Sequence, residues 1–168
     1  ILGKKIILVE DCVHGFLSTV RGHPLGSFGD ISFISYRKYL PLPDGARIEF
    51  YGVSSPSVRI RTAILYPALR TFLLLLKGLR SHFPPLLPDS FFYGSFKYAE
   101  RLLSPPRQPA RMSFLSRKLL STVDLPGVVA ARRKNYTYLL THLNNEKIKP
   151  LFSTLPDGVC PIGFPLLC

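Results

Sequence analysis

The chain has 168 residues and a net charge of +12, because 22 Lys and Arg outnumber 10 Asp and Glu. Its 46% share of hydrophobic residues excludes a disordered chain, and its 16 prolines argue against a bundle made of helices alone. Three cysteines without a CxxC pair and four scattered histidines indicate neither a disulfide framework nor a structural zinc site. We therefore expect a reducing compartment and no metal.

The first third of the chain predicts three short strands. Residues 5–9 consist of Lys5 and four apolar residues in a row, which is typical of a parallel strand buried on both faces. Residues 31–35 and 47–51 predict two more strands, with a loop rich in Pro and Gly over residues 38–45 between them. Three strands this close together in sequence indicate part of a larger sheet.

The middle of the chain predicts a helix over residues 58–82 with a Leu-rich segment inside it. The uncharged run at residues 71–76 is far shorter than the ~20 residues that a membrane span needs. We therefore expect a buried or interface helix and no membrane span. A helix lying on a membrane surface is the alternative.

The second half predicts a connection followed by two helices. Residues 84–110 contain six prolines, which indicates a connecting region with a domain boundary inside it. Residues 113–121 predict a short helix, and residues 124–143 a longer one that Asp124 caps at its N-terminus. Residues 148–168 are irregular, with a possible strand from Phe164.

Four side chains with useful chemistry accompany the first two strands. Asp11 follows a buried strand, where open α/β sheets place ligands, and His14 comes three residues later. Ser35 ends the second strand, and Lys38 follows it by three residues. Pyridoxal phosphate needs a lysine for a Schiff base, an anion beside its pyridine nitrogen and donors for its phosphate. Each residue alone also has a structural alternative, and Ser32 is a second candidate for the phosphate.

Several motifs resemble the DegT/DnrJ/EryC1/StrS sugar aminotransferases, which are pyridoxal-phosphate enzymes of fold type I. The sequence E-D-C-V-H-G at residues 10–15 is similar to their E-D-[AC]-x-H-[AG] signature. L-G-S-F-G-D-I-S-F at residues 25–33 resembles the family's G-S-F-G-D-hydrophobic stretch, which lies at the same distance downstream. S-Y-R-K followed by L-P-L-P-D-G-A, at residues 35–46, is similar to a variant of their lysine segment. Weaker similarities, including P-I-G-F-P at residues 161–165, continue toward the end of the chain.

The resemblance implies a role for each of the four candidates. Asp11 would pair with the pyridine nitrogen of pyridoxal 5'-phosphate, and His14 would contact the ring near its phenolic oxygen. Ser35 would bind the phosphate. Lys38 would form the Schiff base and then act as the catalytic proton carrier. Arg37 cannot replace Lys38, because a guanidinium stays protonated.

The resemblance also implies the fold and its division into domains. We expect an α/β fold: part of a fold type I large domain with a mainly parallel sheet over residues 1–84, then a Pro-rich connection over residues 85–111. The start of a smaller α+β C-terminal domain follows over residues 112–168. Because the chain starts at Ile1 and ends at Cys168 after an apolar stretch, we expect a fragment that lacks the N-terminal half.

The resemblance implies that the parent enzyme is a cytoplasmic homodimer. It would move an amino group from an amino acid, of the glutamate type, to a nucleotide-linked keto-sugar in polysaccharide or antibiotic-sugar biosynthesis. The chain departs from the family pattern where Gly45 is followed by Ala46, whose methyl group would crowd its surroundings. A catalytically degenerate relative is therefore one alternative. The other is a basic protein that binds nucleic acid or a membrane surface, although no nucleic-acid motif accompanies the charge.

Overall fold

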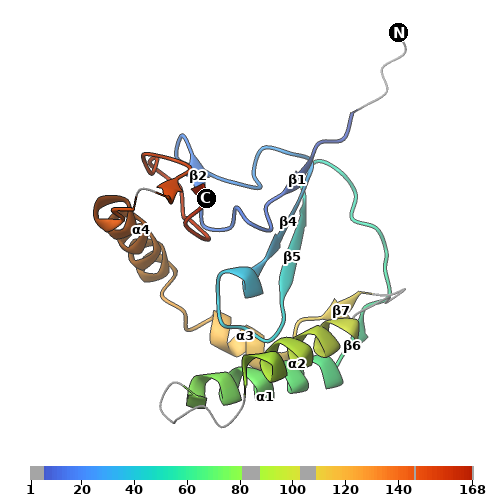
Figure 1. Cartoon of the computed structure of the whole chain (residues 1–168). Helices are drawn as coiled ribbons and strands as arrows, with labels where there is room; N and C mark the ends of the chain where they lie inside the picture. The colour runs from blue at the N-terminus through green and yellow to red at the C-terminus, as the bar shows by residue number, and fades with distance from the viewer. Residues whose placement is uncertain (1–5, 81–87, 103–108, 146, 168) are drawn as a thin grey trace. The chain divides into compact units, whose positions relative to one another are not determined.

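The computed structural model describes residues 6–80, 88–102, 109–145 and 147–167 (Figure 1). It is a mixed α/β structure whose chain forms two compact units. Within the described residues, unit 1 contains residues 6–39, residues 47–54 and the chain from Val123 onward, and unit 2 contains residues 40–46 and 55–122. The three predicted segments 1–84, 85–111 and 112–168 do not coincide with these units and stay a prediction.

Unit 1 is built on a three-stranded sheet in the order β1-β4-β5, drawn side by side in Figure 1. The strands are β1 (Val9–Asp11), β4 (Ile31–Ser35) and β5 (Ala46–Phe50). β1 and β4 are parallel, with Val9 opposite Ile31 and Asp11 opposite Phe33. The strands predicted over residues 31–35 and 47–51 are therefore present, and the expected parallel pairing is confirmed for β1 and β4.

The first strand differs from its prediction in position and in burial. Residue 5 lies outside the described part, residues 6–8 are not assigned to a strand, and β1 begins at Val9. The side chains of Ile6, Ile7, Leu8 and Val9 are all at least half exposed. The apolar run correctly indicated a strand nearby. It did not reveal that β1 is an edge strand, bonded only to β4 among the described strands.

Two irregular segments complete the first half of unit 1. A small antiparallel hairpin joins β2 (Thr19–Val20) to β3 (His23–Pro24). Its turn places Arg21 at φ +52° and Gly22 at φ +81°, which only the glycine adopts without strain. Beyond β4, a single 3₁₀ turn, η1 (Tyr36–Lys38), leads into the predicted loop.

The second half of unit 1 holds helix α4 (Leu125–His142) and the short pair β8 (Lys149–Pro150) and β9 (Leu166–Leu167). Asp124 caps α4 as predicted, because its carboxylate accepts a hydrogen bond from the Gly127 amide at 3.0 Å. The buried residue of α4 is Tyr136, which lies 4.7 Å from Phe164 between ring centres.

Unit 2 is mainly helical. It contains α1 (Leu65–Arg80), α2 (Asp89–Arg101) and α3 (Phe114–Leu120), with β6 (Arg61–Thr62) parallel to β7 (Ala110–Arg111). α1 and α2 lie side by side (Figure 1) and bury a core of Tyr66, Leu73 and Ala99. The predicted short helix corresponds to α3, and Ser113 caps it.

Two predictions in unit 2 are corrected by the structure. The helix predicted over residues 58–82 begins only at Leu65, because the chain before it pairs with β7 and the Arg61 amide donates to Pro109. The predicted connection over residues 84–110 contains the 13-residue helix α2. The prolines lie on either side of α2 and do not interrupt it, so its apolar residues form a continuous face against α1. Among the described helices, none could cross a bilayer.

Candidate functional site

The candidate residues come from the ends of β1 and β4. Because these strands are parallel, their carboxyl ends meet at one edge of the sheet. Asp11 is the last residue of β1, and Ser35 is the last residue of β4. His14 and Lys38 each follow three residues later. The local fold thus brings the predicted residues to the same edge, within unit 1.

Asp11 is exposed at this edge, and its carboxylate has one internal partner. One oxygen accepts a hydrogen bond from the Val13 amide at 3.0 Å, which turns the chain at the end of β1. A carboxylate has room for further donors after one such bond. Asp11 can therefore act as a turn residue and still accept a proton donor from a ligand.

His14 is tied to the segment that carries Lys38 through its backbone. The Tyr39 hydroxyl donates to the His14 carbonyl oxygen at 2.5 Å, and Phe16 packs edge-on against Tyr36 and Tyr39 at 5.2 and 5.8 Å between ring centres. The His14 ring itself is exposed. These contacts fix the two loops beside each other and leave the imidazole open to solvent.

Tyr39 is the buried centre of that contact, and only 4% of it is exposed. Burial raises its pKa to about 12, and the nearby Arg132 guanidinium opposes that shift. Arg132 lies 5.0 Å above the Tyr39 ring and donates to the Tyr39 carbonyl at 2.9 Å. The hydroxyl is therefore neutral at ordinary pH and serves as a fixed donor.

Ser35 and Lys38 lie at the end of β4. Lys38 is exposed, and among the described residues its amine has no ion pair or hydrogen bond. Ser35 is half buried, and its hydroxyl does not cap η1. Ser32, the alternative to Ser35, is only 3% exposed and lies under Gly26. Ser35 is therefore the better candidate for contact with a ligand.

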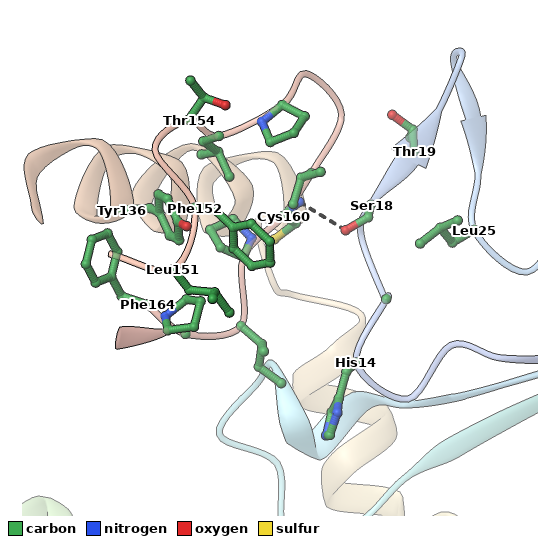
Figure 2. Close-up of a pocket in the computed structure, with 18 of the residues that line it drawn as sticks. His14, Ser18, Thr19, Leu25, Tyr136, Leu151, Phe152, Thr154, Cys160 and Phe164 are labelled. Carbon is green, nitrogen blue, oxygen red and sulfur yellow. Dashed lines mark hydrogen bonds between the residues drawn. The ribbon is translucent and has the colours of Figure 1, made fainter. Parts of the chain in front are cut away.

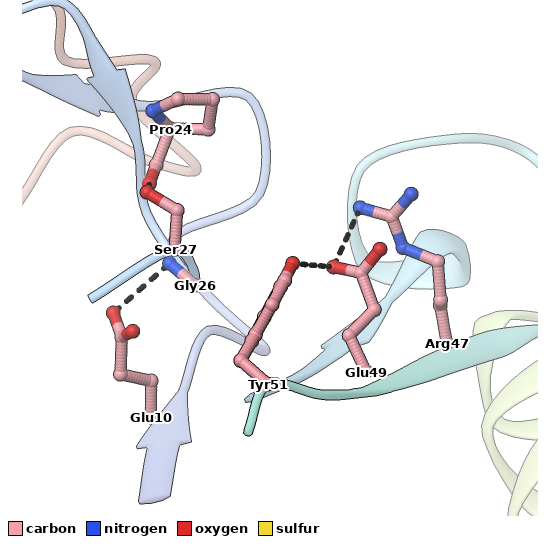
Figure 3. A network of polar contacts seen from close by, with 7 residues as sticks. All are labelled: Glu10, Pro24, Gly26, Ser27, Arg47, Glu49 and Tyr51. Carbon is pink, nitrogen blue, oxygen red and sulfur yellow. Dashed lines mark hydrogen bonds and ion pairs between the residues drawn. The ribbon is translucent and has the colours of Figure 1, made fainter. Parts of the chain in front are cut away.

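Glu10 is a residue of this region that the sequence analysis left without a role. Its carboxylate accepts hydrogen bonds from the amides of Gly26, Phe28 and Gly29 at 2.9, 2.6 and 2.5 Å (Figure 3 shows the bond to Gly26). Gly29 has to be a glycine, because an added Cβ would lie 2.8 Å from the Leu8 carbonyl oxygen. The signal in the sequence was an acidic residue beside Asp11 and a glycine-rich loop downstream.

The charged residues of β5, Arg47 and Glu49, interact with each other and with Tyr51. Arg47 lies 3.3 Å from the Glu49 carboxylate, which also accepts a hydrogen bond from the Tyr51 hydroxyl at 2.8 Å (Figure 3). That bond is the main reason why the pKa of Tyr51 is raised. The Ala46 methyl is exposed, so it does not crowd the described part of the chain.

Cys12 and Cys160 are buried free thiols. Burial raises the pKa of both, and Glu10 and Asp11 add to the shift at Cys12. A buried thiol with a raised pKa is a poor nucleophile and a poor metal ligand. Cys168 lies outside the described residues. Within the described chain, no three His, Cys, Asp or Glu side chains are arranged to hold a metal ion.

An apolar groove of about 890 Å³ lies next to His14 within unit 1 (Figure 2). Its walls come from residues 15–25, from Tyr136 of α4 and from residues 151–165. The Cys160 amide donates to Ser18 at 3.0 Å and holds two of these segments together. None of the described lining residues is charged, so the groove suits an apolar group. Of the four candidates, only His14 borders it.

The donor set at the sheet edge is suited to pyridoxal phosphate by its chemistry. It offers an open carboxylate, an open imidazole, a hydroxyl and an open primary amine, from two neighbouring strand ends. Asp11 would hold the pyridine nitrogen, Ser35 the phosphate and Lys38 the aldehyde carbon.

No protein-family model matches this chain, and comparisons with curated proteins and with solved structures found no match either.

Proposed function

We propose that this chain carries the lysine-bearing part of a pyridoxal-phosphate-dependent aminotransferase that resembles the sugar aminotransferases. The observation that supports it most is the parallel register of β1 and β4, which brings the segment of Asp11 and His14 to the same edge as Ser35 and Lys38. A lysine on an unrelated edge or face would have argued against the assignment.

Each of the four side chains at this edge would have its own role. Bound there, pyridoxal phosphate would supply an electron sink for the carbon that carries the amino group. Asp11, as a carboxylate, favours a protonated partner at the ring nitrogen. Lys38 would hold the cofactor through a covalent bond to its amine, and the free amine of Lys38 would carry a proton during the transfer. Ser35 and His14 orient the ring.

The substrates follow from the resemblance in this proposal. An amino acid would donate the amino group, and a nucleotide-linked keto-sugar would accept it, in a cytoplasmic homodimer. The exposed positions of Asp11, His14 and Lys38 are compatible with a site that a further segment or a second subunit covers.

Covalent trapping on Lys38 tests the proposal. The full 168-residue chain is incubated with pyridoxal phosphate, its visible spectrum is recorded, and borohydride reduction is followed by peptide mass mapping. We expect an absorption band of bound cofactor and a reduced adduct on Lys38. Lys38→Ala should lose both, and Asp11→Ala should weaken cofactor binding by about tenfold or more, since a charge-assisted contact contributes about 1.5–3 kcal/mol.

Lys134→Ala is the matched control, because Lys134 is also an exposed lysine of unit 1 but lies on α4. It should bind the cofactor like the unaltered chain. Adducts spread over surface lysines, with no preference for Lys38, would contradict the proposal. A specific adduct without transfer from any amino donor would point instead to a catalytically degenerate relative.

A further inference from the structure

Helix α1 of unit 2 has an apolar stripe that no described element covers. Leu65, Phe72 and Leu79 recur every seven residues, with Leu75 between them, so they share one face of the helix. All four side chains are more than half exposed. A different face of α1, with Tyr66 and Leu73, packs against α2.

The stripe borders a groove of about 670 Å³ that lies wholly within unit 2. Ile64, Phe72 and Leu75 line it from the side of α1, and Phe114 and Leu115 line it from α3. Phe114 is 76% exposed. Large apolar side chains that cluster at this exposure are typical of an interaction surface rather than of ordinary surface scatter.

The rim of the groove is cationic. Arg111 and Arg117 line it, both are exposed, and neither forms an ion pair among the described residues. An apolar floor bounded by two guanidinium groups selects for a partner that combines apolar and anionic chemistry.

Unit 2 as a whole also carries a net positive charge. Its described residues include ten Lys and Arg but only three acidic residues. Each acidic side chain already has a partner: Asp44 binds Ser113 and Ser116, Asp89 pairs with Arg80, and Glu100 lies 3.7 Å from Arg70. The exposed cations of the unit are therefore left without internal compensation.

We propose that this face of unit 2 docks on an anionic lipid bilayer. The apolar side chains of α1 and α3 would enter the boundary between headgroups and acyl chains, while Arg111 and Arg117 contact anionic headgroups. A second copy of the chain fits less well, because it would set two cationic faces against each other. The cations extend along the unit beyond the groove, which suits an extended anionic surface better than one short acidic partner.

Vesicle binding tests the proposal without reference to the cofactor. The full chain is sedimented with phosphatidylcholine vesicles, with or without phosphatidylglycerol, over a range of salt. We expect binding only when the anionic lipid is present, weakening as salt rises. Arg111→Gln with Arg117→Gln should reduce the affinity about thirtyfold, since each basic residue near the surface contributes about 1 kcal/mol. Phe114→Ser should reduce it about tenfold or more.

Two controls separate the groove from general charge and general hydrophobicity. Lys134→Gln with Lys147→Gln changes the net charge equally in unit 1, and Tyr98→Ser removes an exposed aromatic ring of α2. Both should change the affinity by less than about twofold. Equal losses in the groove variants and the controls would overturn the proposal. Failure to bind anionic vesicles would also overturn it, and binding to poly-glutamate instead would assign the groove to an acidic protein.

Discussion

At the scale of single residues, Glu10 is the side chain on which the candidate site most depends. Its carboxylate accepts three backbone amides from the loop over residues 26–29, and each hydrogen bond to a charged group contributes about 1.5–3 kcal/mol. We expect Glu10→Ala to lower the free energy of unfolding by about 3 kcal/mol, less than the sum of the three bonds, because these bonds are exposed or only partly buried and the freed amides can hydrogen-bond to water. Urea denaturation measures the change.

Glu10→Gln is the informative companion variant. The amide keeps one acceptor oxygen but loses the charge, so about half of the loss should remain. A Glu10→Ala protein as stable as the unaltered chain would mean that the loop over residues 26–29 is held by other contacts.

Tyr39 predicts how stability depends on alkaline pH. Because burial raises its pKa to about 12 from the ordinary 10, the unfolded chain loses this proton at lower pH than the folded chain does. The contribution is complete below pH 10 and is lost as the pH rises through about 12, amounting to about 3 kcal/mol at most. Denaturation between pH 9 and 12 should therefore show a smaller alkaline decline in Tyr39→Phe. Parallel declines in the two proteins would contradict this linkage.

At the scale of elements, the start of α3 is fixed by a carboxylate from a distant loop. Asp44 accepts hydrogen bonds from the Ser113 amide at 2.9 Å, from the Ser113 hydroxyl at 2.7 Å and from the fully buried Ser116 hydroxyl. Asp44→Ala leaves these donors without their acceptor, and we expect a loss of about 2–4 kcal/mol in chemical denaturation.

Asp89→Ala is the matched control for that prediction. Asp89 also belongs to unit 2, but its side chain is almost fully exposed and pairs only with Arg80. Exposed pairs contribute little to stability, so this variant should unfold almost like the unaltered chain. Similar losses in both variants would show that the charge of Asp44, rather than its hydrogen bonds, matters.

The elements that were predictable from the sequence are those with local signals. Asp124 followed by Pro126 marked the start of α4, and the Pro- and Gly-rich loop separated β4 from β5. Helix α2 was missed because the prolines on either side of it obscured a 13-residue stretch without any. The position of β1 was missed because strand burial depends on neighbours that are distant in sequence.

At the scale of the whole molecule, the net charge of +12 predicts that added salt stabilises the fold. Like charges repel more strongly in the compact state, and salt screens that repulsion over about 10 Å at 0.1 M. We expect the Tm to rise by a few degrees between 20 and 300 mM sodium chloride. A variant with the exposed lysines Lys118 of α3 and Lys134 of α4 changed to glutamine should show a smaller rise. A Tm that falls with salt would indicate that ion pairs such as Arg70 with Glu100 dominate.

The candidate site was predictable only in part, because some of its contacts join residues that are far apart in the sequence. Asp11, Ser35 and Lys38 follow two strands, and strand ends can be located from local patterns. The apolar groove beside His14 was not predictable, because its walls join residues 15–25 to residues 151–165, which no local pattern connects. The role of Glu10 needed the same long-range information.

Hydrogen bonds from two arginines of α4 hold the irregular segment at residues 156–162, and they leave its side chains free to vary. Arg133 donates to the carbonyls of Pro156 and Val159 at 2.9 and 2.7 Å, and Arg132 donates to those of Pro161 and Ile162 at 3.3 and 3.4 Å. Every residue type has a carbonyl, so these contacts constrain the path of the segment but not its side chains. Substitutions can therefore reshape the groove wall at positions such as Ile162. At Arg132 even lysine would lose contacts, because it lacks the planar guanidinium that donates to several carbonyls at once.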